Sequence, residues 1–146
     1  RVALLVWGDP SLYDSTLRIA GRVAADLPLK ASVVPGITSL QALTAAHAIP
    51  INMVGAPFLV TTGRRLRDEG WPAGADTVAV MLDGECSFRT VPPEGVTIWW
   101  GAYVGMPEEI TLYGPLAAVA DTVVEIRAKA RDAHGWIMDI YILRRS

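Results

Sequence analysis

The run Val2-Ala3-Leu4-Leu5-Val6-Trp7 constrains the fold most, because a strand that is apolar on both faces must be covered on both faces. Parallel strands flanked by helices meet this requirement. Gly8-Asp9-Pro10 ends the run. Gly8 has no Cβ, Asp9 has a short side chain that accepts hydrogen bonds, and the ring of Pro10 fixes its φ. No cap, linker or signal sequence precedes the run, so we expect the natural protein to have an N-terminal part before Arg1.

Strand and helix patterns alternate along the chain that follows. A helical stripe ends at Pro28, and an Ala-rich helix ends before Pro50. Helices are predicted at 12–27, at 40–48, from Gly63 through Arg64, Arg65 and Arg67, and from Leu116 to Gly135. Strands are predicted at 30–34, 56–62, 76–82, 95–102, 110–113 and 136–143. Alternation early and strands later predict an α/β chain with a mixed sheet, and Pro28 to Lys30 is the expected domain change.

Charge and cysteine content limit the class of partner. Thirteen basic and fifteen acidic residues give a formal charge of −2, so nothing attracts the chain to nucleic acid or to an anionic membrane as a whole. Residues 31–63 contain no charged side chain, but Pro35, Pro50 and Pro57 interrupt this stretch too often for a membrane-spanning helix. Cys86 is the single cysteine and zinc-ligand spacings are absent, which predicts a reduced cytoplasmic protein without a metal, in which Cys86 is simply packed.

Two turns follow predicted strands and carry small or polar residues. Gly8-Asp9-Pro10 lies where open α/β folds place ligands, and Pro35-Gly36-Ile37-Thr38-Ser39 offers main-chain amides and two hydroxyls at a helix start. Each has an ordinary alternative: the first can be a simple strand-ending turn, and Thr38 or Ser39 can be a helix cap. A regular recurrence of such turns favours a nucleoside-type ligand.

The longer strings around these turns resemble a known family. Trp-Gly-Asp-Pro-Ser-Leu-Tyr-Asp-Ser at 7–15 and Val-Val-Pro-Gly-Ile-Thr-Ser at 33–39 resemble the tetrapyrrole methylases, which use S-adenosylmethionine. The strings at 58–66 and 99–103 look like members of that family that act on corrin precursors. The resemblance implies a C-methyltransferase of cobalamin biosynthesis, a homodimer with two α/β domains and the cofactor in the cleft between them.

In that arrangement residues 1–28 would end the first domain and residues 29–146 would form the complete second one, with a mixed sheet. The family's first Gly-rich motif is absent from this chain. The resemblance also implies which residues meet S-adenosylmethionine and its product S-adenosylhomocysteine: Trp7, Gly8, Asp9, Thr38, Ser39, Met81, Leu82, Gly101, Ala102 and Trp136. The family's usual Tyr-Met-Gly is Met81-Leu82-Asp83-Gly84 here, and Met81 and Leu82 fit an ordinary core equally well.

Two further sets concern a tetrapyrrole substrate. Arg64, Arg65 and Arg67 could bind its carboxylates through bidentate guanidinium contacts, although a solvated helix face explains such a charge run equally well. The candidates for catalytic proton transfer are Asp9, Tyr13, Asp14 and Glu85, of which Tyr13 and Asp14 rank nearest the substrate by loop position. Two other interpretations stay open: a family member with another substrate, such as a diphthamide or ribosomal-RNA methylase, and a non-catalytic nucleotide-binding module.

Overall fold

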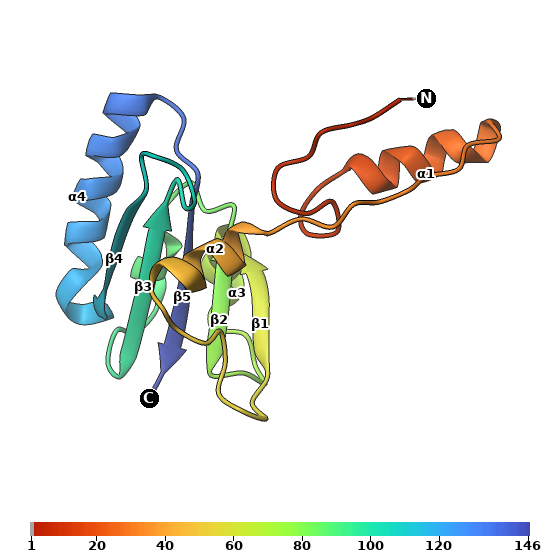
Figure 1. The fold of residues 1–146 in the computed structure, drawn as a ribbon. Helices are drawn as coiled ribbons and strands as arrows, with labels where there is room; N and C mark the ends of the chain where they lie inside the picture. Colours follow the sequence, from red (N-terminus) through yellow and green to blue (C-terminus); the bar gives the residue numbers. More distant parts are fainter. Residues whose placement is uncertain (1) are drawn as a thin grey trace. The chain divides into compact units, whose positions relative to one another are not determined.

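The computed structural model describes residues 2–146, and the chain divides into two compact units, Arg1–Gln41 and Ala42–Ser146 (Figure 1). The domain change predicted at Pro28 to Lys30 stays a prediction. None of the helices within residues 2–146 has the length and apolar character needed to cross a membrane.

Within its described residues, 2–41, the first unit contains one complete helix, α1 (Thr16–Asp26), and the start of α2 (Ser39–Ala46), which runs across the boundary between the units. The strands predicted at 2–7 and 30–34 do not form. A strand requires hydrogen bonds to a neighbouring strand, and among residues 2–146 neither segment has such a neighbour. Their apolar side chains are accordingly exposed, Leu5 completely and Val34 by 85%.

The second unit is built on one five-stranded sheet. Its elements are β1 (Phe58–Thr62), α3 (Gly63–Glu69), β2 (Thr77–Met81), the 3-10 helix η1 (Ser87–Thr90), β3 (Val96–Ala102), β4 (Ile110–Pro115), α4 (Leu116–His134) and β5 (Asp139–Arg145). The strand order is β1-β2-β5-β3-β4, with β1 and β2 parallel and the other neighbours antiparallel. The predicted mixed α/β sheet is therefore confirmed.

The core fills the face of the sheet that α3, η1 and α4 cover (Figure 1). Alternate strand residues point into it, among them Val78, Trp100 and Tyr141, and all three are fully or almost fully buried. Phe88 of η1 meets Tyr141 edge to face, with the ring centroids 5.3 Å apart. Aromatic side chains thus hold the sheet to the helical layer.

The strand directions put the ends of β1, β2 and β3 and the start of β5 at one edge of the sheet. We call this the C-terminal edge. In register, Thr62 lies beside Met81, and Ala102 lies beside Asp139. Loops that are far apart in the sequence therefore meet along this edge, as open α/β sheets commonly arrange their ligand sites.

Candidate functional site

The Asp9 carboxylate joins the first turn, residues 8–10, to the second turn, residues 35–39, within the first unit. Its Oδ1 accepts hydrogen bonds from the Ser11 main-chain N–H and hydroxyl, at 2.9 and 2.5 Å, and its Oδ2 accepts from the main-chain N–H of Gly36 at 2.8 Å. These donors lower the pKa of Asp9, the Ser11 hydroxyl most and the Gly36 amide next. Asp9 is ionised at neutral pH and fixes the distance between the turns.

The second turn approaches the first so closely that only glycine fits. A Cβ on Gly36 would lie 2.0 Å from the carbonyl oxygen of Gly8, a distance that real Cβ atoms essentially never show. Gly8 itself has a φ of +72°, which other residues rarely adopt. The turns predicted separately from the sequence therefore form a single structure within the first unit.

Thr38 has a demonstrable role at the start of α2. Its hydroxyl accepts from the main-chain N–H of Leu40 at 3.2 Å and donates to the side-chain oxygen of Gln41, which also accepts from the Thr38 N–H at 3.3 Å. This reciprocal pattern is a helix cap, the ordinary alternative to ligand binding. The contact of Thr38 and of its neighbour Ser39 with a cofactor stays a prediction.

Trp7, Tyr13 and Asp14 lie on the surface of the first unit. Trp7 is 76% exposed, and Tyr13 is about half exposed with a φ of 50°, an unusual backbone conformation for a residue with a side chain. Asp14 accepts a hydrogen bond from the main-chain N–H of Thr16 at 2.5 Å, so its carboxylate helps α1 to begin. The catalytic roles of Tyr13 and Asp14 stay predictions.

In the second unit, the residues predicted to meet the cofactor gather at the C-terminal edge. Met81 ends β2, Gly101 and Ala102 end β3, and Trp136 shortly precedes β5. Leu82, directly after β2, is 67% exposed and has a φ of 54°. The sheet topology thus brings these positions to one edge.

Their exposure differs sharply. Trp136 and Leu82 present most of their surface to solvent, whereas Ala102 has none exposed. The space beside Gly101 is filled by Val104 and Leu43, whose atoms lie 2.6 and 2.7 Å from where a Cβ would be. Leu82 and Trp136 are therefore available to a ligand, and the contacts predicted for Gly101 and Ala102 stay predictions.

The three arginines of α3 differ in their ion-pair partners. Arg65 pairs with Glu69 at 2.7 Å, and Arg67 contacts Glu85 at 2.5 Å and Asp68 at 3.0 Å. The Arg64 side chain is exposed and makes no hydrogen bond or ion pair to any of residues 2–146. Of the predicted substrate cations, Arg64 is the one whose guanidinium group is not already paired within this part of the chain.

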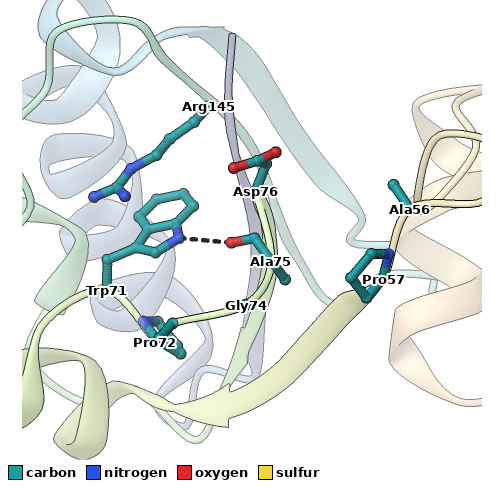
Figure 2. Close-up of a pocket in the computed structure, with 9 residues that line it drawn as sticks. Ala56, Pro57, Trp71, Pro72, Gly74, Ala75, Asp76 and Arg145 are labelled. Carbon is teal, nitrogen blue, oxygen red and sulfur yellow. Dashed lines mark hydrogen bonds between the residues drawn. The ribbon is translucent and has the colours of Figure 1, made fainter.

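A cavity of about 270 Å³ lies at the other edge of the sheet, among the residues that lead into β1 and β2 (Figure 2). The guanidinium carbon of Arg145 lies 4.0 Å from the centroid of the Trp71 ring, and the Trp71 indole donates to the carbonyl of Ala75 at 2.9 Å. This cavity is separated from the C-terminal edge by the length of the strands. It contains none of the predicted site residues.

A group of buried polar residues beneath the C-terminal edge, centred on Asp83 and Arg127, was not predicted from the sequence. The signal for Arg127 was present: it lies between Val123 and Ala130 on the apolar stripe of α4, where a charged side chain needs a partner. That partner is Asp139, with Nε and Oδ2 2.9 Å apart. No local pattern could have identified this pairing.

A mixed sheet whose strand-end loops carry exposed side chains, such as that of Leu82, defines an α/β protein of the kind that has its site in such loops. Residues 1–120 match the family described as Tetrapyrrole (Corrin/Porphyrin) Methylases. The chain belongs to this tetrapyrrole methylase family.

Relatives at several levels of sequence identity support the family assignment. A precorrin-6A synthase (deacetylating) from Sinorhizobium sp is 54% identical over 145 residues, which are 98% of this chain and 55% of that protein. The crystal structure of the cobalamin-synthesis-related protein CobF from Corynebacterium diphtheriae is 43% identical with a TM-score of 0.89, over 97% of this chain and 60% of that one. The chain therefore spans little more than half the length of these relatives.

A more distant structure shares the fold. The uroporphyrin-III C-methyltransferase from Thermus thermophilus, complexed with S-adenosylhomocysteine, is 21% identical with a TM-score of 0.61, over 94% of this chain and 62% of that one.

Proposed function

We propose that the complete protein is an S-adenosylmethionine-dependent C-methyltransferase of cobalamin biosynthesis. In this proposal it methylates C-1 of precorrin-5 and releases the acetyl group as acetate, giving precorrin-6A. The observation that carries the proposal is the 54% identity with a precorrin-6A synthase across 98% of this chain. Because the chain covers 55% of that relative, the activity is assigned to the complete gene product.

Each of the two units exposes apolar side chains that suit a nucleoside with a sulfonium tail. Trp7 in the first unit, and Leu82 and Trp136 in the second, each expose more than half of their surface, which a purine ring or a thioether can cover. We assign cofactor contact to these side chains, to the main chain of Gly8, Met81, Gly101 and Ala102, and to Asp9, Thr38 and Ser39. Bound S-adenosylmethionine would supply a methyl group already activated on sulfur.

The residues of the chain then have a simple task, because methyl transfer depends mainly on placing two reactants in line and keeping water away. The hydrogen bonds of the Asp9 carboxylate, which we call the Asp9 bridge, hold the first and second turns at a fixed separation. The main-chain groups of the turns therefore need not reorganise when the cofactor binds. The exposed indole of Trp7, next to the first turn, would cover the bound cofactor and keep water away from it. No covalent intermediate with the protein is required.

Loss of the acetyl group is a hydrolysis and needs a proton acceptor. Water adds its oxygen to the acetyl carbonyl, the bond from that carbon to the macrocycle breaks, the electron pair goes to the macrocycle, and acetate leaves. We propose Tyr13 or Asp14 as the group that accepts the proton from water. Both lie exposed in the loop before α1, beside the Asp9 turn.

The carboxylates of the substrate would meet the arginines of α3. We assign the main contact to Arg64, since Arg65 and Arg67 are already paired with acidic side chains. Replacing Arg64 by Ala should raise the KM for precorrin-5 by roughly five- to thirtyfold. Arg65→Ala is the matched control, because it removes an exposed charge whose pair with Glu69 contributes little. Equal KM values in the two variants would reject this assignment.

We also propose that the protein is a cytoplasmic homodimer whose macromolecular partner is a second copy of itself. Analytical ultracentrifugation of the complete gene product tests the oligomeric state, and a monomer at micromolar concentration would contradict it.

Calorimetric titration of the complete gene product with S-adenosylhomocysteine tests the cofactor assignment. We expect saturable binding that Trp7→Ala weakens, because this substitution removes an exposed indole. Binding of adenosine and ATP as tight as that of S-adenosylhomocysteine would instead favour a general nucleotide-binding module.

A further inference from the structure

Asp83 is a buried carboxylate that follows β2 and is fully supplied with donors. It is 6% exposed and accepts from the Ser87 amide at 2.6 Å, the Ser87 hydroxyl at 2.9 Å and the Tyr141 hydroxyl at 2.7 Å. Burial, and after it the nearby charge of Asp83, raise the pKa of Tyr141, so this hydroxyl remains a donor at every physiological pH. The end of β2 is thereby tied to β5.

Arg127 makes a second connection beneath the same edge. Its guanidinium group donates to both oxygens of Asp139, at 2.9 and 3.3 Å, and to the main-chain carbonyl of Asp83 at 3.1 Å. The indole of Trp100 also donates to Asp139, at 3.0 Å. The ion pair is almost completely buried, with side-chain exposures of 10% for Arg127 and 6% for Asp139. Side chains from α4 and β3 thus fix the start of β5 and the loop after β2 together.

Leu82 lies between β2 and this fixed point. Its φ of 54° is a left-handed conformation that costs free energy for any residue with a Cβ. Such a conformation persists where the surrounding structure holds it, and here both the carbonyl and the carboxylate of the next residue, Asp83, are held. The Leu82 side chain nevertheless points out, with 67% of its surface exposed.

The same buried group touches the junction of β1 and α3. A Cβ on Gly63 would lie 2.3 Å from the Asp83 carboxylate, so Asp83 occupies the space that a side chain would need at the first residue of α3. Gly63 directly precedes Arg64. The position of Asp83 therefore determines the conformation of both the loop after β2 and the start of α3, the helix that carries Arg64.

Buried charges are costly to keep, and well-packed apolar side chains often stabilise a core as well or better. The buried charges of Asp83, Arg127 and Asp139 lie directly beneath the exposed residues of the C-terminal edge. Their cost is explained if they fix the geometry of this edge. We propose that Asp83, Tyr141 and Arg127 are positioning residues for cofactor binding, which act by holding Leu82 and the start of β5 in the conformation that binds S-adenosylmethionine. This inference rests on the proposed methyltransferase function.

The variant Tyr141→Phe in the complete gene product tests the proposal, since it removes one hydroxyl and keeps the ring in the core. We expect the affinity for S-adenosylhomocysteine, measured by calorimetry, to fall roughly five- to thirtyfold. Val96→Ala is the control. Val96 is buried at the opposite edge of the sheet, so its truncation destabilises the fold without disturbing Asp83 and should leave the affinity unchanged.

A double-mutant cycle distinguishes positioning from general destabilisation. Glycine adopts a left-handed φ at little cost, so in a Leu82→Gly background Tyr141→Phe should lose much less affinity than it does in the wild type. Equal losses in the two backgrounds would overturn the proposal.

The milder variant Ser87→Ala removes one donor to the same carboxylate and should weaken binding in the same direction by a smaller factor. Unchanged affinity in both Tyr141→Phe and Ser87→Ala would overturn positioning while leaving the proposed function intact. A wild-type protein that fails to bind S-adenosylhomocysteine would remove the proposed function and this inference with it.

Discussion

Substituting Gly63 by Ala should destabilise the fold through a single displaced carboxylate. The new Cβ would lie 2.3 Å from Cγ and Oδ1 of Asp83 and 2.5 Å from its Cβ, which forces Asp83 to move. Hydrogen bonds to a charged group contribute about 1.5–3 kcal/mol each, and overpacking a core costs about 1–3 kcal/mol. The higher helix propensity of Ala offsets up to about 1 kcal/mol. With one such hydrogen bond lost, we therefore expect a net loss of about 1.5–5 kcal/mol in the free energy of unfolding.

Thermal and urea unfolding of the complete gene product measure this loss, with Gly84→Ala as the control. Gly84 lies one residue from Asp83, yet nothing lies within 4 Å of the position that its Cβ would take. At about 2–4 °C per kcal/mol, Gly63→Ala should lower Tm by roughly 3–20 °C, and Gly84→Ala should stay within about 0.5 kcal/mol of the wild type. If the two variants unfold alike, the role assigned to the Asp83 network is wrong.

Further expectations concern the first unit and Cys86. Gly36→Ala should weaken S-adenosylhomocysteine binding at least roughly tenfold in calorimetry, because its Cβ would lie 2.0 Å from a carbonyl oxygen of the first turn; Gly21→Ala, which meets nothing within 4 Å, should not. Since hydrogen bonds from Ser11 and the second turn lower the pKa of Asp9, its contribution to stability is present above the unfolded pKa and is lost as pH falls through the folded one. An NMR titration of the carboxyl carbon should show a midpoint below that of an ordinary aspartate, and a raised midpoint would contradict the bridge. Burial raises the pKa of the Cys86 thiol, so the native protein should react with a disulfide reagent far more slowly than the unfolded one at neutral pH; equal rates would show that the thiol is accessible.

The sequence alone predicted the elements whose signal is local. β1 and α3 were expected from the strand pattern that ends at Thr62 and the polar helix that begins at Gly63, and both are present. The long helix was expected to end at Gly135, which is its C-cap. Turn residues, periodicity and caps act within a few positions, so a single sequence reveals them.

What the sequence could not predict depends on distant partners. The apolar runs at 2–7 and 30–34 have the composition of strands, but a strand exists only where a neighbour supplies hydrogen bonds. The contact from Asp9 to Gly36 and the pairing of Arg127 with Asp139 join segments that no local pattern connects. The role of Asp83 as a fixed point was hidden for the same reason.

The proposed reaction is tested most directly by turnover. The complete gene product is incubated with precorrin-5 and S-adenosylmethionine that carries a deuterated methyl group, and the tetrapyrrole and the released acid are analysed by mass spectrometry. We predict a tetrapyrrole that has gained the labelled methyl and lost the acetyl group, together with an equal amount of acetate. An unchanged tetrapyrrole, from a protein that binds S-adenosylhomocysteine, would contradict the assigned substrate and reaction.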